Sequence, residues 1–145
     1  MSKELATRLH DFSYGHIVTG HEGKCRNLHG HNGRIHFTVT ADELDSVGRV
    51  MDFAAIKDRL CSWLEENWDH KFLVWEHAEE QLVRGLQRLD PAGVVVVPFN
   101  PTAENMARYL LKVIGPQQLA GTGCVLIQVR VEETRKCSAE AYEIT

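Results

Sequence analysis

The stretch from Arg34 to Ala41, RIHFTVTA, constrains the fold more than any other part of the chain. Its apolar residues alternate with polar ones, and this period of two predicts a β-strand with one buried face. The apolar row is Ile35, Phe37, Val39 and Ala41. A segment ending near His16 is expected to be its hairpin partner.

A second alternating stretch, CVLIQVRVEE, occupies residues 124–133. It predicts another strand, and residues 139–145, AEAYEIT, are expected to return beside it after a turn. The apolar row expected on one face is Val125, Ile127, Val129 and Val131.

Two segments between these strand pairs have the spacing of amphipathic helices, with apolar residues three and four apart. Asp52 is expected to cap the first helix and Thr102 the second, which should stop at Gly115 and Pro116. The expected apolar faces hold Phe53, Ile56, Leu60 and Leu64 in the first helix, and Met106, Tyr109, Leu110 and Val113 in the second.

The element order is therefore strand, strand, helix, helix, strand, strand. It predicts an α+β fold, a four-stranded antiparallel sheet with two helices on one face. No repeat or linker-like run divides the chain, so residues 1–145 are expected to form one domain. Within the segment from Trp75 to Phe99, the run RLDPAGVVVVPF is a candidate for an extra strand or edge.

Charge and composition argue against several kinds of partner. The formal net charge is -4, with 25% charged residues and no block of like charges, which disfavours a nucleic-acid or membrane surface. No apolar run approaches the roughly 20 residues of a membrane-spanning helix, and the N-terminus lacks a signal-peptide pattern. We expect a cytoplasmic protein with reduced cysteines, whose partner is a small molecule or another protein.

The stretch CRNLHGH, residues 25–31, brings one thiol and two imidazoles together. If the strand that contains Ile35 and Phe37 extends back through Gly33, His29 and His31 share the face of its apolar row, about 6.5 Å apart along the strand. Two such side chains can close around a metal ion, and His16 in FSYGH could supply a third ligand. Three histidines with an open fourth position would be a catalytic zinc arrangement. The alternative is a pair of polar loop residues that form hydrogen bonds and hold no metal.

Three other positions carry candidate chemistry. Cys25 lies between Lys24 and Arg26, a positive setting that favours a thiolate acting as base or nucleophile, although free cysteines are commonly small buried hydrophobes. Asp69 and His70 in WDH set a carboxylate beside an imidazole, which could orient a proton carrier, although such neighbours also occur by chance.

Glu133 continues the apolar row of the strand at 124–133 when residues are counted in twos from Val125. A carboxylate on the inner face needs hydrogen-bond donors or a positive partner. A ligand with an amidine-like N–C–N edge would supply two donors in a matching fork. The alternative is an ordinary glutamate at the end of a strand, facing solvent.

Six motifs in order carry a resemblance over nearly the whole chain: FSYGH, CRNLHGH, MDF, WDH, NPTAEN and EET. The chain resembles the 6-pyruvoyltetrahydropterin synthase and 6-carboxytetrahydropterin synthase family. The resemblance implies a tunnelling fold in which three subunits close their sheets into a barrel and two trimers stack as a homohexamer. It also implies active sites at the subunit interfaces.

The resemblance further implies a zinc cofactor, a pterin substrate, 7,8-dihydroneopterin triphosphate, and a set of site residues. The implied zinc ligands are His16, His29 and His31; the implied catalytic residues are Cys25, Asp69 and His70; and the implied substrate-binding residues are Glu133, which anchors the pterin, with Thr102 and Glu104.

Two reactions are consistent with these residues. One is carbon–carbon cleavage to 6-carboxy-5,6,7,8-tetrahydropterin with release of acetaldehyde and triphosphate, a step towards queuosine and other deazapurines. The other is loss of triphosphate to 6-pyruvoyltetrahydropterin, towards tetrahydrobiopterin. The three residues between Cys25 and His29 match the spacing of the carboxy-type bacterial enzymes and favour the first. A zinc-containing pterin-binding protein without turnover is a third alternative, which the presence of Cys25, Asp69 and His70 disfavours.

Overall fold

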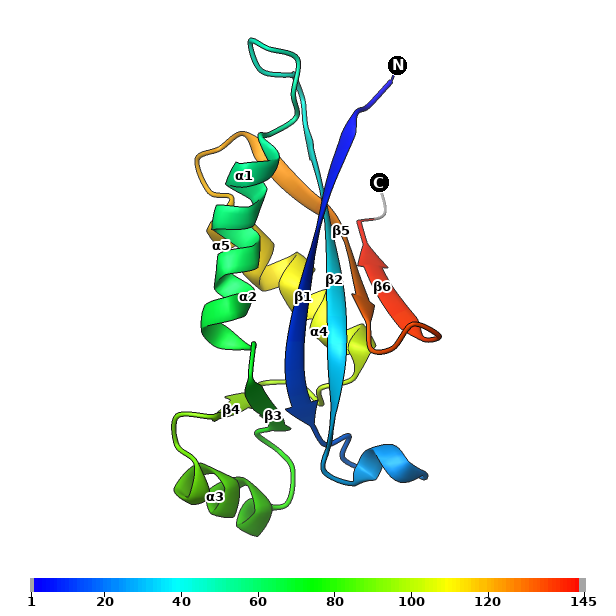
Figure 1. Cartoon of the computed structure of the whole chain (residues 1–145), viewed down its shortest axis with the longest axis vertical. Helices are drawn as coiled ribbons and strands as arrows, with labels where there is room; N and C mark the ends of the chain where they lie inside the picture. Colours follow the sequence, from blue (N-terminus) through cyan, green and yellow to red (C-terminus); the bar gives the residue numbers. More distant parts are fainter. Residues whose placement is uncertain (1, 144–145) are drawn as a thin grey trace.

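The computed structural model describes residues 2–143, and its backbone is dominated by a long hairpin. Strands β1 (Leu5–His16) and β2 (His29–Ala41) pair antiparallel, as the alternation around Phe37 predicts. Strand β5 (Cys124–Glu132) pairs with β2, and β6 (Ser138–Tyr142) pairs with β5, both antiparallel (Figure 1). Residues 1, 144 and 145 of the expected domain lie outside the described residues, and the last two of these also belong to the expected last strand.

The expectation of a four-stranded sheet is wrong, because the segment after the first helix adds two strands. Strand β3 (Lys71–Trp75) pairs parallel with the end of β1, and β4 (Val94–Val97) pairs parallel with β3. Helix α3 (Glu80–Leu89) connects them, so the sheet is mixed, with the order β4-β3-β1-β2-β5-β6. The extra strand expected in RLDPAGVVVVPF is confirmed as β4. A short apolar run without alternation is typical of a parallel strand covered on both faces.

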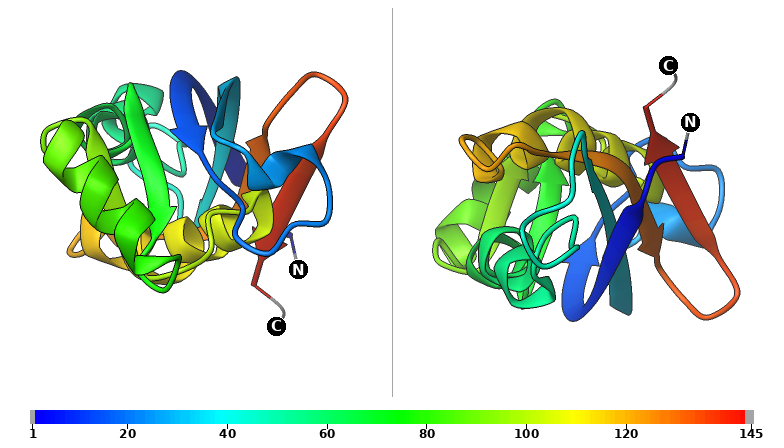
Figure 2. Two further views of the ribbon diagram at one scale, coloured as in Figure 1. Left: turned by 90° about the horizontal axis from the view of Figure 1, so that it is seen from below. Right: turned by 90° about the horizontal axis from the view of Figure 1, so that it is seen from above.

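Two longer helical segments cover one face of the sheet (Figure 2). The first contains α1 (Phe53–Ile56) and α2 (Ser62–Asn67), joined by a π-helical turn, and the Asp52 side chain caps it by accepting a hydrogen bond from Ala54 N. The second contains α4 (Ala103–Tyr109) and α5 (Gly115–Gln118), also joined by a π-helical turn.

Both expected helix caps are confirmed, since Thr102 accepts a hydrogen bond from Asn105 N. The expected stop at Gly115 is wrong, because Pro116 lies in the first turn of α5, where a missing N–H is tolerated. None of the helices in residues 2–143 is both long and apolar enough to cross a membrane.

The core fills the space between the sheet and these two helical segments. Its fully buried side chains come from both layers: Ile35, Phe37, Val39, Ile56, Leu60, Leu64, Met106 and Leu110. Two expected helix-face residues lie outside it, since Phe53 is 55% exposed at the first turn of α1 and Val113 is 36% exposed. The π-helical turn shifts the face of the second segment by one residue, so Ile114 is buried in place of Val113.

A β-bulge corrects the expected face of β5. The pairing with β2 shifts between Thr38 and Val39, which face Gln128 and Leu126. Leu126 is therefore buried, whereas Val125 is 55% exposed, so the expected row is wrong at its start. The alternation after the bulge is regular, and Val129 and Val131 are fully buried.

Candidate functional site

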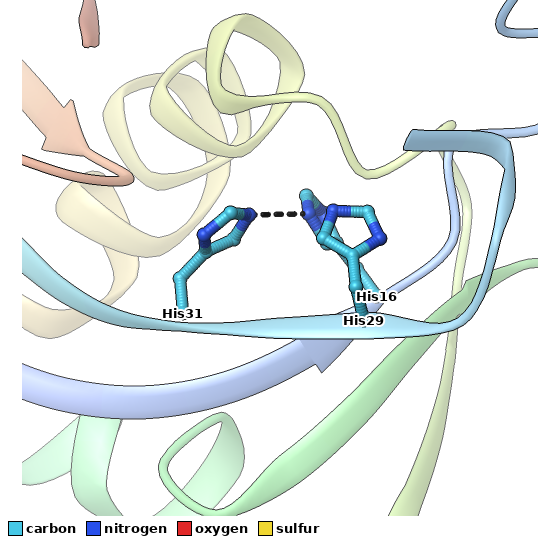
Figure 3. A group of neighbouring side chains, drawn as sticks. All are labelled: His16, His29 and His31. Carbon is cyan, nitrogen blue, oxygen red and sulfur yellow. Dashed lines mark hydrogen bonds between the residues drawn. The ribbon is translucent and has the colours of Figure 1, made fainter. Parts of the chain in front are cut away.

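Three histidines converge at the end of the β1–β2 hairpin. His16 closes β1 and lies opposite His29 at the start of β2, while His31 lies opposite Tyr14. All three imidazoles project from the same face of the two strands (Figure 3). One ring nitrogen from each histidine lies within 4.8 Å of the others, and the His31 Nε2 and His16 Nε2 atoms are 3.1 Å apart.

Backbone carbonyls orient two of these rings. The His16 Nδ1–H donates to the Pro101 carbonyl at 2.7 Å, and the His29 Nδ1–H donates to the Asn27 carbonyl at 2.7 Å. In these tautomers the Nε2 atoms carry lone pairs, and His29 Nε2 is buried without a hydrogen-bond partner among the described residues. Unprotonated Nε2 atoms held from behind by carbonyls, as in these two rings, are donors that suit a divalent metal such as zinc.

Burial favours the neutral form of two of these histidines. It lowers the pKa of His16 from 6.5 to about 4, and it also lowers the pKa of His31. A metal competes with protons for imidazole nitrogen, so a depressed pKa leaves these ligands available at neutral pH.

A hollow of about 300 Å³ brings together four of the expected site residues, although none of the three histidines lines it. Cys25, Thr102, Glu104 and Glu133 all line it. Glu133 directly follows β5, its two carboxylate oxygens lying 3.9 Å from His16 Nε2 and 3.9 Å from His31 Nε2. Partly buried Cys25 lies in a short 3₁₀ turn, Lys24–Arg26.

Asp69 and His70 form a second group at the edge of β1. Trp68 before them is 1% exposed, which anchors the segment, and His70 takes a positive φ of 61°. The Asp69 carboxylate accepts from Ser13 N at 2.9 Å, and its other oxygen lies 2.9 Å from His70 Nδ1. Although burial acts to raise the pKa of Asp69, these two hydrogen bonds lower it overall.

Within one chain, His70 and Cys25 are not brought together. The His70 side chain is 79% exposed and lines a different hollow, together with His29 and His31. His70 and Cys25 therefore face different hollows of one chain.

The motif NPTAEN positions the site in a way that sequence reasoning missed. The Asn100 amide bonds both backbone groups of Thr19, at 3.0 and 2.9 Å, which ties the loop after β1 to the start of α4. The neighbouring Pro101 carbonyl orients His16. The motif NPTAEN was noted in the sequence, but only Thr102 and Glu104 were assigned roles, so Asn100 and Pro101 were overlooked.

Tyr14 is a second residue that was missed. Its ring lies on the inner face between Phe12 and His16, and it is 3% exposed, with a hydroxyl that has no hydrogen-bond partner among residues 2–143. Burial and the charge of Glu133 raise its pKa. Its position two residues before His16 would have placed it on the face of the trio.

Comparison with known proteins identifies the family. The family model described as 6-pyruvoyl tetrahydropterin synthase matches residues 5–143. The chain belongs to this family. The resemblance carried by the six motifs is therefore confirmed.

Relatives from two bacteria carry one name. A protein of Rickettsia felis is 32% identical over 134 residues, covering 92% of this chain and 96% of its own, and is named 6-carboxy-5,6,7,8-tetrahydropterin synthase. A Haemophilus influenzae protein of the same name is 33% identical over 115 residues, covering 76% of this chain and 77% of its own. The chain is thus similar to pterin synthases over most of its length.

Solved structures share the fold. An uncharacterized protein from Wolinella succinogenes superposes with a TM-score of 0.87 at 23% identity, covering 99% of this chain and 100% of its own. The 6-pyruvoyl tetrahydropterin synthase of Caenorhabditis elegans gives 0.70 at 24% identity, covering 99% and 98%. These likenesses support the curled mixed sheet with helices on one face.

Proposed function

We propose that the protein converts 7,8-dihydroneopterin triphosphate into 6-carboxy-5,6,7,8-tetrahydropterin, with release of acetaldehyde and triphosphate, in the biosynthesis of queuosine and related deazapurines. The observation that carries the proposal is the convergence of three imidazole nitrogens near Glu133, which also lines a hollow with Cys25. The names of the relatives and the three-residue spacer after Cys25 support the carboxy-type product.

Zinc is the proposed cofactor, with His16, His29 and His31 as its ligands. When bound, it supplies Lewis acidity that lowers the pKa of substrate hydroxyls. The carbonyls of Pro101 and Asn27 hold two of the rings in the required tautomer. These contacts keep the two rings from turning away from the proposed zinc.

The other residues have separate proposed roles. Glu133 accepts two hydrogen bonds from the N–C–N edge of the pterin and so orients the ring, with Thr102 and Glu104 lining the pocket. Cys25 as thiolate and His70, oriented by Asp69, move protons on opposite sides of the substrate side chain.

The proposed assembly is a homohexamer, two stacked trimers with active sites between subunits. The outer edge of β1 is paired with β3 only at Tyr14–His16, and the outer edge of β6 has no strand beside it in residues 2–143. Two such edges can join head to tail and close into a ring, which removes both. Joining copies in this way also provides a route by which His70 of one chain reaches Cys25 of the next.

The deciding experiment is to incubate the zinc-loaded protein with 7,8-dihydroneopterin triphosphate, identify the products by mass spectrometry and assay acetaldehyde separately. Acetaldehyde with the 6-carboxy product is expected. A 6-pyruvoyl product without acetaldehyde would favour 6-pyruvoyltetrahydropterin synthase activity, after which the family is named. No conversion would favour a zinc-containing pterin-binding protein.

The ligand assignment has its own test. The substitution His31→Ala is expected to abolish stoichiometric zinc binding, measured by elemental analysis after dialysis. His36→Ala is the matched control, because His36 lies on the same strand but pairs with Glu132 on the opposite face. Unchanged zinc content in His31→Ala would contradict the assignment.

A further inference from the structure

The environment of the Glu133 carboxylate is unusual for a charged group. The side chain is 23% exposed, and within residues 2–143 it forms neither a hydrogen bond nor an ion pair with lysine or arginine. Its two oxygens lie 3.9 Å from the Nε2 atoms of His16 and His31. A largely buried carboxylate without a donor is unfavourable unless a cation balances its charge.

The distances fit a shared cation. Ligand atoms bound tetrahedrally at about 2.1 Å lie roughly 3.4 Å from one another. The two histidine nitrogens are 3.1 Å apart, and each lies 3.9 Å from one oxygen of Glu133. A small rotation within the Glu133 side chain would bring one oxygen into the ligand shell of a metal held by the trio.

We propose that Glu133 is a fourth metal ligand in the substrate-free protein, and that it leaves the metal when the N–C–N edge of a pterin binds. This inference rests on the proposed function, because it takes zinc and a pterin as the ligands. It adds a second role to Glu133: the open coordination position appears only after the ring has been recognised.

The backbone around Glu133 is fixed, so the exchange is confined to its side chain. Glu133 N donates to the Cys137 carbonyl at 3.1 Å. The Thr134 hydroxyl accepts from Lys136 N and Cys137 N at 3.1 and 3.2 Å, which stabilises the turn into β6. A fork of two N–H donors offers the carboxylate a full set of partners away from the metal.

The first test measures metal affinity without substrate. Zinc binding by Glu133→Gln, measured by competition with a chromogenic chelator, is expected to be weaker than wild type by about tenfold or more. Glu132→Gln is the matched control, because Glu132 is 22% exposed, nearly the same as Glu133, but faces His36 on the other side of the sheet. Unchanged affinity in Glu133→Gln would overturn the inference.

The second test follows the coordination directly with cobalt(II) in place of zinc. The probe is unsubstituted pterin, which has the N–C–N edge but no side-chain hydroxyls. Saturating pterin is expected to change the visible absorption of the cobalt wild type, and Glu133→Gln is expected to show the altered spectrum without pterin. A wild-type spectrum that does not respond to bound pterin would overturn the inference.

Failure of the proposed function gives a different result. If the wild type bound neither zinc nor cobalt, the metal site itself would be refuted, and the inference with it. If the wild type bound zinc through the trio and turned over substrate, but Glu133→Gln retained full zinc affinity, only the inference would fail.

Discussion

At the scale of single residues, the site depends on which atoms are left without partners. The Nε2 atom of His29 is buried and unpartnered, while the Nδ1 atoms of His16 and His29 are satisfied by carbonyls. Leaving a buried polar atom unpaired is unfavourable by about 1–3 kcal/mol. The His29 Nε2 atom, which lies among the other two imidazoles, is therefore a candidate for binding a ligand.

Cys25 provides the first residue-scale prediction. The substitution Cys25→Ala is expected to abolish turnover while zinc stoichiometry and pterin binding remain, because the thiol lines the hollow but is not one of the three proposed zinc ligands. Turnover is measured by product formation and binding by pterin fluorescence. Cys124→Ser, at the far end of β5, is the control and should retain activity. Retained activity in Cys25→Ala would remove the thiol from the mechanism.

His16 makes the stability of the metal-free protein depend on pH. Its folded pKa is about 4, against 6.5 when unfolded, so between these values the unfolded chain binds a proton that the folded chain does not. Stability is therefore expected to fall as the pH drops from 6.5 towards 4. Thermal melts of the metal-free protein should show a flatter profile for His16→Gln. The control, His77→Gln, changes a 71% exposed ring and should leave the slope as in wild type.

At the scale of elements, the β1–β2 register brings the trio together. Twelve residue pairs, from Leu5 opposite Thr40 to His16 opposite His29, prevent a slip in register that would move every histidine to the other face. Gly33 allows the Tyr14 ring and the Glu132 carbonyl to pack closely against β2, because a Cβ there would lie 2.9 Å from Tyr14 Cε1 and 3.2 Å from the Glu132 carbonyl.

A pair of glycine substitutions tests this packing. Gly33→Ala is expected to lower the free energy of unfolding by about 1–3 kcal/mol, because the neighbouring rings must move. Gly85→Ala, within α3, has nothing within 4 Å of the added Cβ and should raise stability by up to about 1 kcal/mol. Urea unfolding at one protein concentration measures both. A neutral Gly33→Ala would show that Tyr14 is loosely packed.

At the scale of the whole molecule, one chain holds all three proposed metal ligands but keeps two proposed catalytic residues apart. All three histidines come from a single hairpin, whereas Cys25 and His70 line separate hollows. The open edges of β1 and β6 offer the means of joining copies. Assembly and activity are therefore expected to depend on one another.

Mixing two inactive variants tests this dependence. Cys25→Ala and His70→Ala are each expected to be inactive, but subunits mixed by denaturation and refolding should recover about a quarter of wild-type activity, because random assembly pairs an intact Cys25 with an intact His70 at one interface in four. Activity is measured on the reassembled mixture, with each variant refolded alone as the control. No recovery would contradict sites built from two subunits.

The sequence by itself determined the β1–β2 and β5–β6 hairpins and both helix caps. It also indicated which three histidines lie together. These depend on short-range alternation and on hydrogen bonds within a few residues of each other, which local sequence specifies. The order of the six motifs was sufficient to identify the family, since that order can be read from the sequence whether or not extra strands lie between the motifs.

Only the tertiary structure decided the rest. Strands β3 and β4 pair in parallel across a helical connection, a choice that depends on the edge left open by β1 and not on their own residues. The bulge opposite Val39 and the π-helical turns move side chains by one position where the layers must fit. The 3.9 Å distance between Glu133 and His16 joins residues far apart in the chain, so it depends on how the strands pack.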